Sequence, residues 1–446
     1  MSDFSLLNEL LEKKRFSAFI AAIDQMNAQD AAEFLSTVKD TRLFMVFRLL
    51  KKDTAAEIFA ELDSDAQEAI IQNMSDKEIS RFMDDLFIDD TVDLLEELPA
   101  NMVGRILQNT SSELREEINR FLKYPRDSVG SIMTSEFVSL YGEWTVERAV
   151  EYVRRVGVNK ETVYAIYVTD PSKILLGILE LKDLLFSPSD RKISELMNAS
   201  LLFVSTADPR EKAAAMISKY DLLALPVTDS ENRLVGIVTV DDAVDVLQEE
   251  ATKDIERMAA ITPTEKPYLK TGVFATWLTR IPWLLLMMLS ATFTGTIITH
   301  YEAALSQAVL LTAFIPMLMG TGGNAGGQAS VTVIRGLSLG ELHMRNLFRI
   351  LWKELRVALL CGITLALVMF GKTMLLDQAA PAVALVISIA VLATVVVAKL
   401  VGCSLPIIAK RIGLDPAVMA SPFITTIVDA VALWIYFGVA TLILKL

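Results

Sequence analysis

Cysteine and histidine are scarce in this sequence of 446 residues, with two of each. Cys361 and Cys403 both lie in apolar runs, and His300 and His343 are the only imidazoles. Neither a disulfide framework nor a zinc site built from several thiolates or imidazoles can be formed from this set. The chain opens with charged, amphipathic sequence, so we expect no cleaved signal peptide.

Positive charge is also in deficit, and only in one part of the chain. The sequence has 42 basic and 55 acidic residues, for a net charge of −13. From Thr271 onward there are 11 basic and 6 acidic residues. Residues 1–270 therefore hold 31 basic and 49 acidic residues and carry a net charge of −18. This acidic part would repel phosphate, which argues against nucleic acid as a partner. No nucleophile–base set or catalytic metal motif is present, so we expect no enzyme.

Five apolar stretches follow Thr271, and each is a candidate membrane span. A helix needs about 20 mostly apolar residues to cross the hydrocarbon core of a bilayer. The third and fourth stretches are shorter than this, so their charged flanks would have to snorkel to the membrane surface. The five stretches are Ile281–Thr299, one within Ala303–Ile334, Val357–Gly371, Ala382–Ala398 and roughly Ala417–Leu444.

Basic residues gather in two of the loops between these stretches. They are Arg335, Arg345, Arg349, Lys353 and Arg356 after the second stretch, and Lys410 and Arg411 after the fourth. The positive-inside rule then places the N-terminal part in the cytoplasm and the C-terminus outside. Glu354 lies among these basic residues, either as an acid at a pore mouth or as the partner of an arginine on its own helix.

Polar residues repeat along one face of the last stretch. Ser421, Thr425 and Asp429 follow each other at intervals of four residues, which stacks them on one side of a helix. An ionised carboxylate in lipid costs several kcal/mol, so Asp429 must face water or a cation unless it is protonated and joins helices. Because intramembrane acids usually mark ion pathways, we favour an ion pathway.

A glycine-rich segment, Gly320–Gln328, interrupts the second stretch. Its overlapping GxxxG pairs, Gly322/Gly326 and Gly323/Gly327, allow close helix packing. Asn324, Gln328 and Thr332 repeat at intervals of four residues. We therefore expect this helix to pack tightly on one side and to form a polar pore wall on another.

Residues 1–125 show helical periodicity without a strand-like run. Short amphipathic pieces are separated by turn signals, which predicts stacked short helices that each begin with an Asp or Ser cap. The densest acidic run, residues 84–97, lies in this part. For most of its residues a solvated helix face is the simplest interpretation.

Residues 127–250 contain an internal duplication. The segment Ser131–Thr134 corresponds to Glu195–Asn198, and Leu175–Leu185 corresponds to Leu234–Val244. An amphipathic helix and a β-rich stretch lie between the paired segments, so each copy is predicted to fold as β-α-β-β-α. The duplication resembles a tandem pair of CBS modules. That resemblance implies an adenosine-nucleotide site, where ATP would be held with Thr239 and Asp242 at the ribose position. Glu180 and Asp183 are their counterparts in the first copy.

The full chain resembles the MgtE family of bacterial Mg²⁺ channels, most specifically in Gly320–Gln328 and in Gly413–Ala417 through Asp429. The predicted fold class is a multi-domain integral membrane protein. An all-α superhelical N domain and an α/β CBS pair are followed by a connecting plug helix and a five-helix transmembrane domain. The predicted boundaries are 1–126 for the N domain, 127–190 and 191–248 for the CBS modules, 249–270 for the plug helix and linker, and 271–446 for the membrane domain.

The resemblance also implies an assembly and ion sites. It implies a homodimer in membrane lipid with the pore on the two-fold axis, where Asp429 holds hydrated Mg²⁺ with help from Ser421 and Thr425. Asn324, on the polar wall, is our fourth pore residue. The acids that would sense Mg²⁺ are Asp89, Asp93, Glu211, Asp221, Asp242, Asp245, Glu250, Asp254 and Asp415. Lys253, Ser421 and Ala432 depart from common family residues, and Lys253 would alter the site that joins Glu250, Asp254 and Asp415.

These features together predict a Mg²⁺-selective channel of the bacterial inner membrane that is gated by intracellular Mg²⁺. Carboxylates on the acidic part would be bridged by Mg²⁺, which prefers oxygen ligands. One alternative is a transporter of Mn²⁺ or Co²⁺ with nucleotide-modulated gating, since oxygen ligands do not exclude these ions. Another is a membrane-anchored CBS nucleotide receptor, although a simple anchor would not need Asp429.

Overall fold

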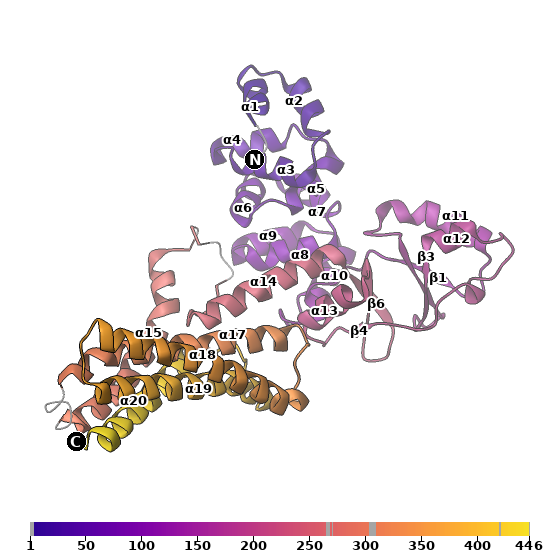
Figure 1. The fold of residues 1–446 in the computed structure, drawn as a ribbon. Helices are drawn as coiled ribbons and strands as arrows, with labels where there is room; N and C mark the ends of the chain where they lie inside the picture. Colours follow the sequence, from indigo (N-terminus) through magenta and orange to yellow (C-terminus); the bar gives the residue numbers. More distant parts are fainter. Residues whose placement is uncertain (1–3, 265–267, 270, 303–308, 419–420, 446) are drawn as a thin grey trace. The chain divides into compact units, whose positions relative to one another are not determined.

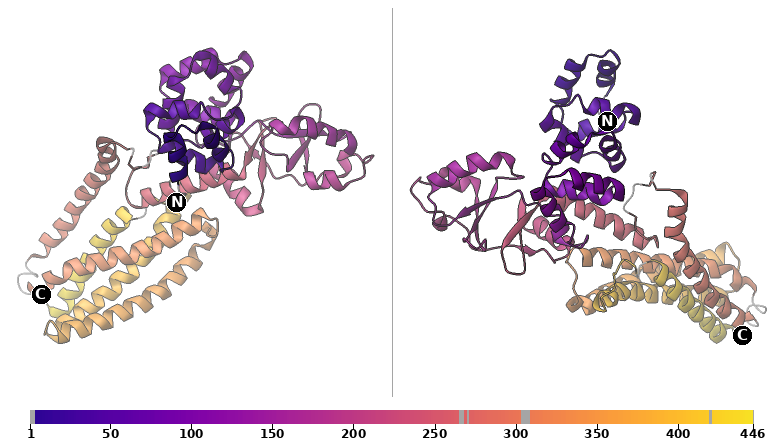
Figure 2. Two further views of the ribbon diagram at one scale, coloured as in Figure 1. Left: turned by 90° about the horizontal axis from the view of Figure 1, so that it is seen from above. Right: turned by 180° about the vertical axis from the view of Figure 1, so that it is seen from behind.

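The computed structural model describes residues 4–264, 268–269, 271–302, 309–418 and 421–445. The chain forms two compact units, Met1–Leu247 and Gln248–Leu446. Figure 1 shows the first unit as short helices followed by two small sheets, and the second as a group of long helices. The two further views in Figure 2 show the same long helices running side by side.

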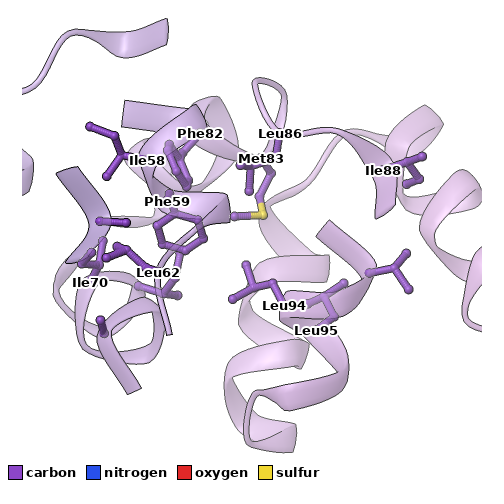
Figure 3. Close-up of a cluster of buried hydrophobic side chains, with 14 of the residues drawn as sticks. Ile58, Phe59, Leu62, Ile70, Phe82, Met83, Leu86, Ile88, Leu94 and Leu95 are labelled. Atoms are coloured by element: carbon purple, nitrogen blue, oxygen red, sulfur yellow. The ribbon is translucent and has the colours of Figure 1, made fainter. Parts of the chain in front are cut away.

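The first unit begins with ten described α-helices of 8 to 10 residues each. Their apolar faces meet in one core, where Phe59 packs edge-to-face on Phe82 at 4.8 Å between ring centroids (Figure 3). The helices are α1 (Ser5–Glu12), α2 (Phe16–Ile23), α3 (Ala28–Ser36), α4 (Asp40–Phe47), α5 (Lys52–Ala60), α6 (Ser64–Asn73), α7 (Asp76–Met83), α8 (Ile88–Glu97), α9 (Ala100–Asn109) and α10 (Ser112–Phe121). The prediction of a helical N-terminal domain is confirmed.

The prediction that each of these helices begins with an Asp or Ser cap is wrong. At four of the ten, a capping side chain accepts a hydrogen bond from a backbone N–H in the first turn of the helix; these caps are Asn27, Asp63, Ser75 and Ser111. Phe87 precedes α8 without a side-chain cap. Helices this short are stabilised mainly by packing of their apolar faces, so a polar cap is not required at every start.

Each copy of the duplication has the predicted order of strands and helices. In both three-stranded sheets the first pair of strands is parallel and the second antiparallel, with a register shift at the same place. The first copy holds η1 (Val129–Ser131), β1 (Val138–Tyr141), α11 (Val146–Val156), η2 (Gly157–Asn159), β2 (Ala165–Thr169), β3 (Leu175–Glu180) and α12 (Leu181–Phe186). The second holds η3 (Ile193–Glu195), β4 (Val204–Ser205), α13 (Arg210–Tyr220), β5 (Ala224–Thr228), β6 (Leu234–Thr239) and α14 (Val240–Met258).

The repeated methionines and glycines of the duplication pack reciprocally between the two copies. A Cβ atom at Gly236 would lie 2.7 Å from the sulfur of Met133, and one at Gly177 would lie 2.6 Å from the sulfur of Met197. The residue after each methionine donates its backbone N–H to the strand that holds the facing glycine, at 2.8 Å in both cases. Glycine is therefore needed at both positions, and the two modules are joined by an exchange of their leading segments.

The second unit contains five helices long and apolar enough to span a membrane, counted over its described residues. The third and fourth candidate spans have 32 and 31 residues, so the prediction that they are short is wrong. Charged residues such as Arg349 and Lys353 lie inside the third helix, which continues past the apolar run. The elements are α15 (Val273–His300), η4 (Val309–Phe314), α17 (Ile315–Ser338), η5 (Met344–Asn346), α18 (Leu347–Leu375), α19 (Pro381–Arg411) and α20 (Ser421–Leu444).

Candidate ion pathway and sensor sites

Helices α17 and α20 together line a polar cavity of about 410 Å³. Three of the four predicted pore residues, Asn324, Thr425 and Asp429, lie in its wall. Because Thr425 and Asp429 are one helical turn apart, both side chains reach the same cavity. The complete lining is Met319, Gly320, Gly323, Asn324, Gly327, Gln328, Thr425 and Asp429.

Among the described residues that line this cavity, Asp429 alone carries a charge. It makes no hydrogen bond or ion pair with any residue that the structure describes, and it lies within the last candidate span. A carboxylate without a protein partner in this setting requires water or a cation. The cavity therefore has the chemistry of a cation pathway, with backbone, amide and hydroxyl groups beside one acid.

The two GxxxG pairs of α17 serve different sides of the helix. Cβ atoms at Gly322 and Gly326 would lie 2.7 Å and 2.6 Å from side chains of α20, and one at Gly402 of α19 would lie 2.2 Å from the Gly326 carbonyl oxygen. Gly323 and Gly327 instead line the cavity. Both predicted roles of the segment, close packing and a polar wall, are present in the same helix.

Other residues near the cavity refine the sequence prediction. Ser421 begins α20, but its side chain lies outside the described residues. Thr332 is not among the described residues of the lining, and its hydroxyl donates to the carbonyl of Gln328 on its own helix. Gly320 belongs to the glycine-rich segment predicted as a polar wall, whereas Met319, one residue earlier, was missed because its apolar side chain does not mark it in the sequence.

The basic group that the structure places beside Glu354 lies on another helix. Its carboxylate lies 3.8 Å from the ammonium of Lys399 on α19, and the side chains are 14% and 6% exposed. It is thus neither in the described cavity lining nor paired with an arginine of its own helix. Sequence spacing could not reveal this contact, because the partner is 45 positions away on another helix.

Carboxylates on α8 lie close enough to Asp242, at the start of α14, for its charge to raise their pKa values. Burial, then the charges of Asp90 and Asp242, raises the pKa of Asp93 to about 7. Burial is also the main cause that raises the pKa of Asp242 to about 6. Burial, then the charges of Asp90 and Asp242, holds the pKa of Asp89 well above its ordinary value. The structure therefore brings together three of the predicted sensor acids, and their mutual repulsion favours a cation between them.

Further acids belong to this group that the sequence did not single out. Burial and the charge of Asp242 raise the pKa of Asp90 to about 6. Burial, then the charges of Asp241 and Asp242, raises the pKa of Glu161, in the first CBS module, to about 7. Asp90 and Asp93 also line a cavity of about 280 Å³. No spacing rule predicts Glu161, because the contact depends on how the first module packs.

The donor chemistry of this group fits Mg²⁺, which takes oxygen ligands and commonly retains several water molecules. Across the described residues, no three acidic, histidine or cysteine side chains converge closely enough to form a metal site. The carboxylates are neighbours but not a preformed coordination shell. A hydrated ion held between them, and not a fully dehydrated one, suits this arrangement.

The remaining predicted sensor acids are more dispersed. Glu211 lies in the first turn of α13 and Asp221 follows its last residue, so they stand about 15 Å apart along the helix. Asp245 lies on α14, where its charge helps to raise the pKa of Glu61. The hydroxyl of Thr239 donates to Asp242 at 2.5 Å, so the two predicted nucleotide residues contact each other.

The acids predicted to bind Mg²⁺ at the plug helix have basic partners in the same unit. Lys253 lies 2.8 Å from Glu250, three residues earlier on α14. Arg257 donates to Asp415 at 2.5 Å. Burial is the main cause that raises the pKa of Asp254, and the charges of Asp415 and Glu250 raise this pKa further.

Comparison with known proteins identifies the family of this chain. The magnesium transporter MgtE of Thermus thermophilus is 33% identical over 98% of this chain and 98% of its own length. The chain belongs to the MgtE family. MgtE of Bacillus subtilis is 30% identical over 97% of this chain and 95% of its own. MgtE proteins are magnesium transporters and not enzymes.

Family models and solved structures agree with this assignment. Residues 315–439 match the MgtE divalent cation transporter model, residues 26–127 the MgtE intracellular N domain, and residues 129–190 and 193–249 the CBS domain. The crystal structure of the soluble part of a magnesium transporter is similar with a TM-score of 0.53 and 30% identity, over 56% of this chain and 98% of that one. The cytosolic domain of the Mg²⁺ channel MgtE in complex with ATP gives a TM-score of 0.51 and 32% identity, over 54% and 98%.

Proposed function

We propose that this MgtE protein is a Mg²⁺-selective channel for magnesium uptake across the bacterial inner membrane, gated by Mg²⁺ on the cytoplasmic side. The observation that carries the proposal is the carboxylate of Asp429, which faces a polar cavity inside a span and has no partner among the described residues. A transporter that binds a hydrated divalent cation needs such an acid, whereas a membrane anchor does not.

The pathway would lie between two copies of the chain in the lipid bilayer. In one copy the described lining of the cavity comes from α17 and α20, and Gly327 has open space where a side chain would be. Polar backbone and amide groups cannot face lipid without cost, so a second copy with its own Asp429 would complete the wall. In this arrangement the N-terminal part faces the cytoplasm and the C-terminus faces outside, as the basic loops favour.

Gating would arise from the crowded acids of the first unit. At low cytoplasmic Mg²⁺, repulsion among Asp89, Asp93 and Asp242 disfavours the compact sensor. Mg²⁺ that binds between these carboxylates favours the compact form, which would place the plug helix in its closed position. The ligand shifts the equilibrium only because it binds the closed form more tightly. Glu211, Asp221 and Asp245 are proposed as further, weaker contributors.

The CBS pair is proposed to bind ATP at Thr239 and Asp242. The cytosolic domain of a related Mg²⁺ channel is in complex with ATP, which supports nucleotide binding by this part of the chain. Because Asp242 also belongs to the acidic group beside α8, nucleotide and Mg²⁺ binding would be coupled through one residue. Transport of Mn²⁺ or Co²⁺ is the alternative, and it shares the same pathway.

Uptake by the Asp429→Asn variant in a Mg²⁺-auxotrophic host tests the pathway. We expect loss of growth at low external Mg²⁺ with normal protein in the membrane, since the amide keeps the shape and removes the charge. Thr441→Ala is the matched control, because Thr441 lies outside the described cavity lining and its hydroxyl donates to the carbonyl of Phe437 on the same helix. Normal Mg²⁺ uptake by the Asp429 variant would refute the pathway. If the unmodified protein transports Mn²⁺ or Co²⁺ but not Mg²⁺, the alternative function is favoured.

A further inference from the structure

The last turns of α14 carry two basic residues that engage the acids around them. Arg257 donates to Oδ2 of Asp415 at 2.5 Å, and these two side chains are each 32% exposed. The other oxygen of Asp415 accepts the backbone N–H of Ala417 at 2.8 Å. Both carboxylate oxygens of Asp415 are therefore engaged by protein donors, one of them charged.

The neighbouring acids on α14 also have protein donors. Lys253 lies 2.8 Å from Oε1 of Glu250, with both side chains about one-fifth exposed. Oδ2 of Asp254 accepts the hydroxyl of Ser338, at the end of α17, at 3.1 Å. Three carboxylates thus stand close to two fixed cations, which leaves one net negative charge to attract a divalent ion.

Apolar packing places this part of α14 against the membrane domain of the same unit. Met258 packs on Ile334 of α17 and on Ala417, just before α20. Ala417 therefore contacts α14 through Met258, and its backbone N–H donates to Asp415, the ion-pair partner of Arg257. The ion pair and the apolar contact bind the same two segments.

We propose that Arg257 acts as a tethered cation that docks the end of α14 on residues 413–417 without a metal ion. The docking contact then supplies a Mg²⁺-independent share of the free energy that closes the channel, and Mg²⁺ at the sensor supplies the rest. This gating role rests on the proposed function, whereas the docking itself does not. The guanidinium is fixed to the chain, so this contribution does not depend on the Mg²⁺ concentration.

Hydrogen exchange of the full-length protein in detergent tests the docking. In Mg²⁺-free buffer we expect Arg257→Gln to raise amide exchange in residues 250–258 about tenfold. Arg411→Gln, an exposed arginine at the end of α19, should leave it unchanged. Arg257→Asp and Asp415→Arg should each behave like Arg257→Gln, and the double variant should restore protection, because it rebuilds the pair with its charges exchanged.

Mg²⁺ uptake by proteoliposomes tests the gating role. With Arg257→Gln, the Mg²⁺ concentration that half-closes the channel should rise about tenfold, which corresponds to about 1.4 kcal/mol. Unchanged exchange in Mg²⁺-free buffer, or a change that appears only when Mg²⁺ is present, would overturn the proposal. Changed exchange with an unchanged closing concentration would confine Arg257 to docking and refute its part in gating. If the unmodified protein carries no Mg²⁺, the proposed function falls, while the exchange experiment still decides the docking.

Discussion

Replacing Asp242 by Asn should stabilise the Mg²⁺-free sensor above pH 6. The pKa of Asp242 is raised from an ordinary 3.8 to about 6, chiefly by burial and then by Asp241 and Asp245, while hydrogen bonds from Thr239 oppose the shift. Asn can still accept the hydroxyl of Thr239, but it carries no charge. The variant therefore removes the electrostatic strain and keeps the local geometry.

The magnitude and the pH window follow from this shift. A pKa raised on folding means that the folded state favours the protonated acid, so stability is retained below about pH 4 and lost as the pH rises to about 6. Two pKa units correspond to about 3 kcal/mol, and water that reaches part of the side chain reduces this to about 1–2 kcal/mol. Asp89, Asp90 and Asp93 would also titrate closer to their ordinary values, since each is raised by the charge of Asp242.

Urea unfolding of residues 1–262 between pH 4.5 and 8, in EDTA, measures the difference. The gain from Asp242→Asn should grow with pH and level off above about pH 6.5, and Mg²⁺ should stabilise the variant less than the unmodified protein. Asp183→Asn, at the corresponding position of the first CBS module, is the matched control and should change stability little. A variant that is less stable at pH 7.5, or a difference that does not depend on pH, would refute the reasoning.

Two further predictions concern the membrane helices. Gly402→Ala should destabilise the protein in detergent by about 1–3 kcal/mol or more, because the new Cβ would lie 2.2 Å from the carbonyl oxygen of Gly326, whereas Gly371→Ala meets nothing within 4 Å. Equal thermal midpoints for the two variants would count against the close helix contact. Glu354→Gln should cost about 3–5 kcal/mol by leaving the buried Lys399 unpaired, and adding Lys399→Met should recover most of it. Equal stabilities of the single and double variants would contradict this pairing.

Local patterns in the sequence predicted much of the fold and of the pore. The spacing of Thr425 and Asp429 and the glycines of α17 depend on one helix each, so periodicity placed them correctly on the cavity wall. The duplication likewise predicted the order of strands and helices in both CBS modules. It did not reveal that Met133 packs on Gly236 of the other copy, because that exchange depends on the tertiary arrangement.

The features that the sequence did not predict depend on contacts between distant segments. Glu354 finds Lys399 on another helix, and Arg257 reaches Asp415 across 158 positions. Hydropathy alone also made the third and fourth spans too short. The third helix begins before its apolar run, with turns that hold Arg349 and Lys353, and the fourth continues beyond its apolar run to Arg411. The sequence also predicted more side-chain caps than the short helices have, because packing supplies most of the stability of these helices.

The most direct test of the central claim is to record single-channel currents carried by Mg²⁺ while Mg²⁺ is titrated on the face that holds the N-terminal part. We expect open channels at low Mg²⁺ on that face and closure as the concentration rises, with no such effect from the opposite face. The absence of Mg²⁺ current, or currents that do not respond to Mg²⁺ on that face, would contradict it.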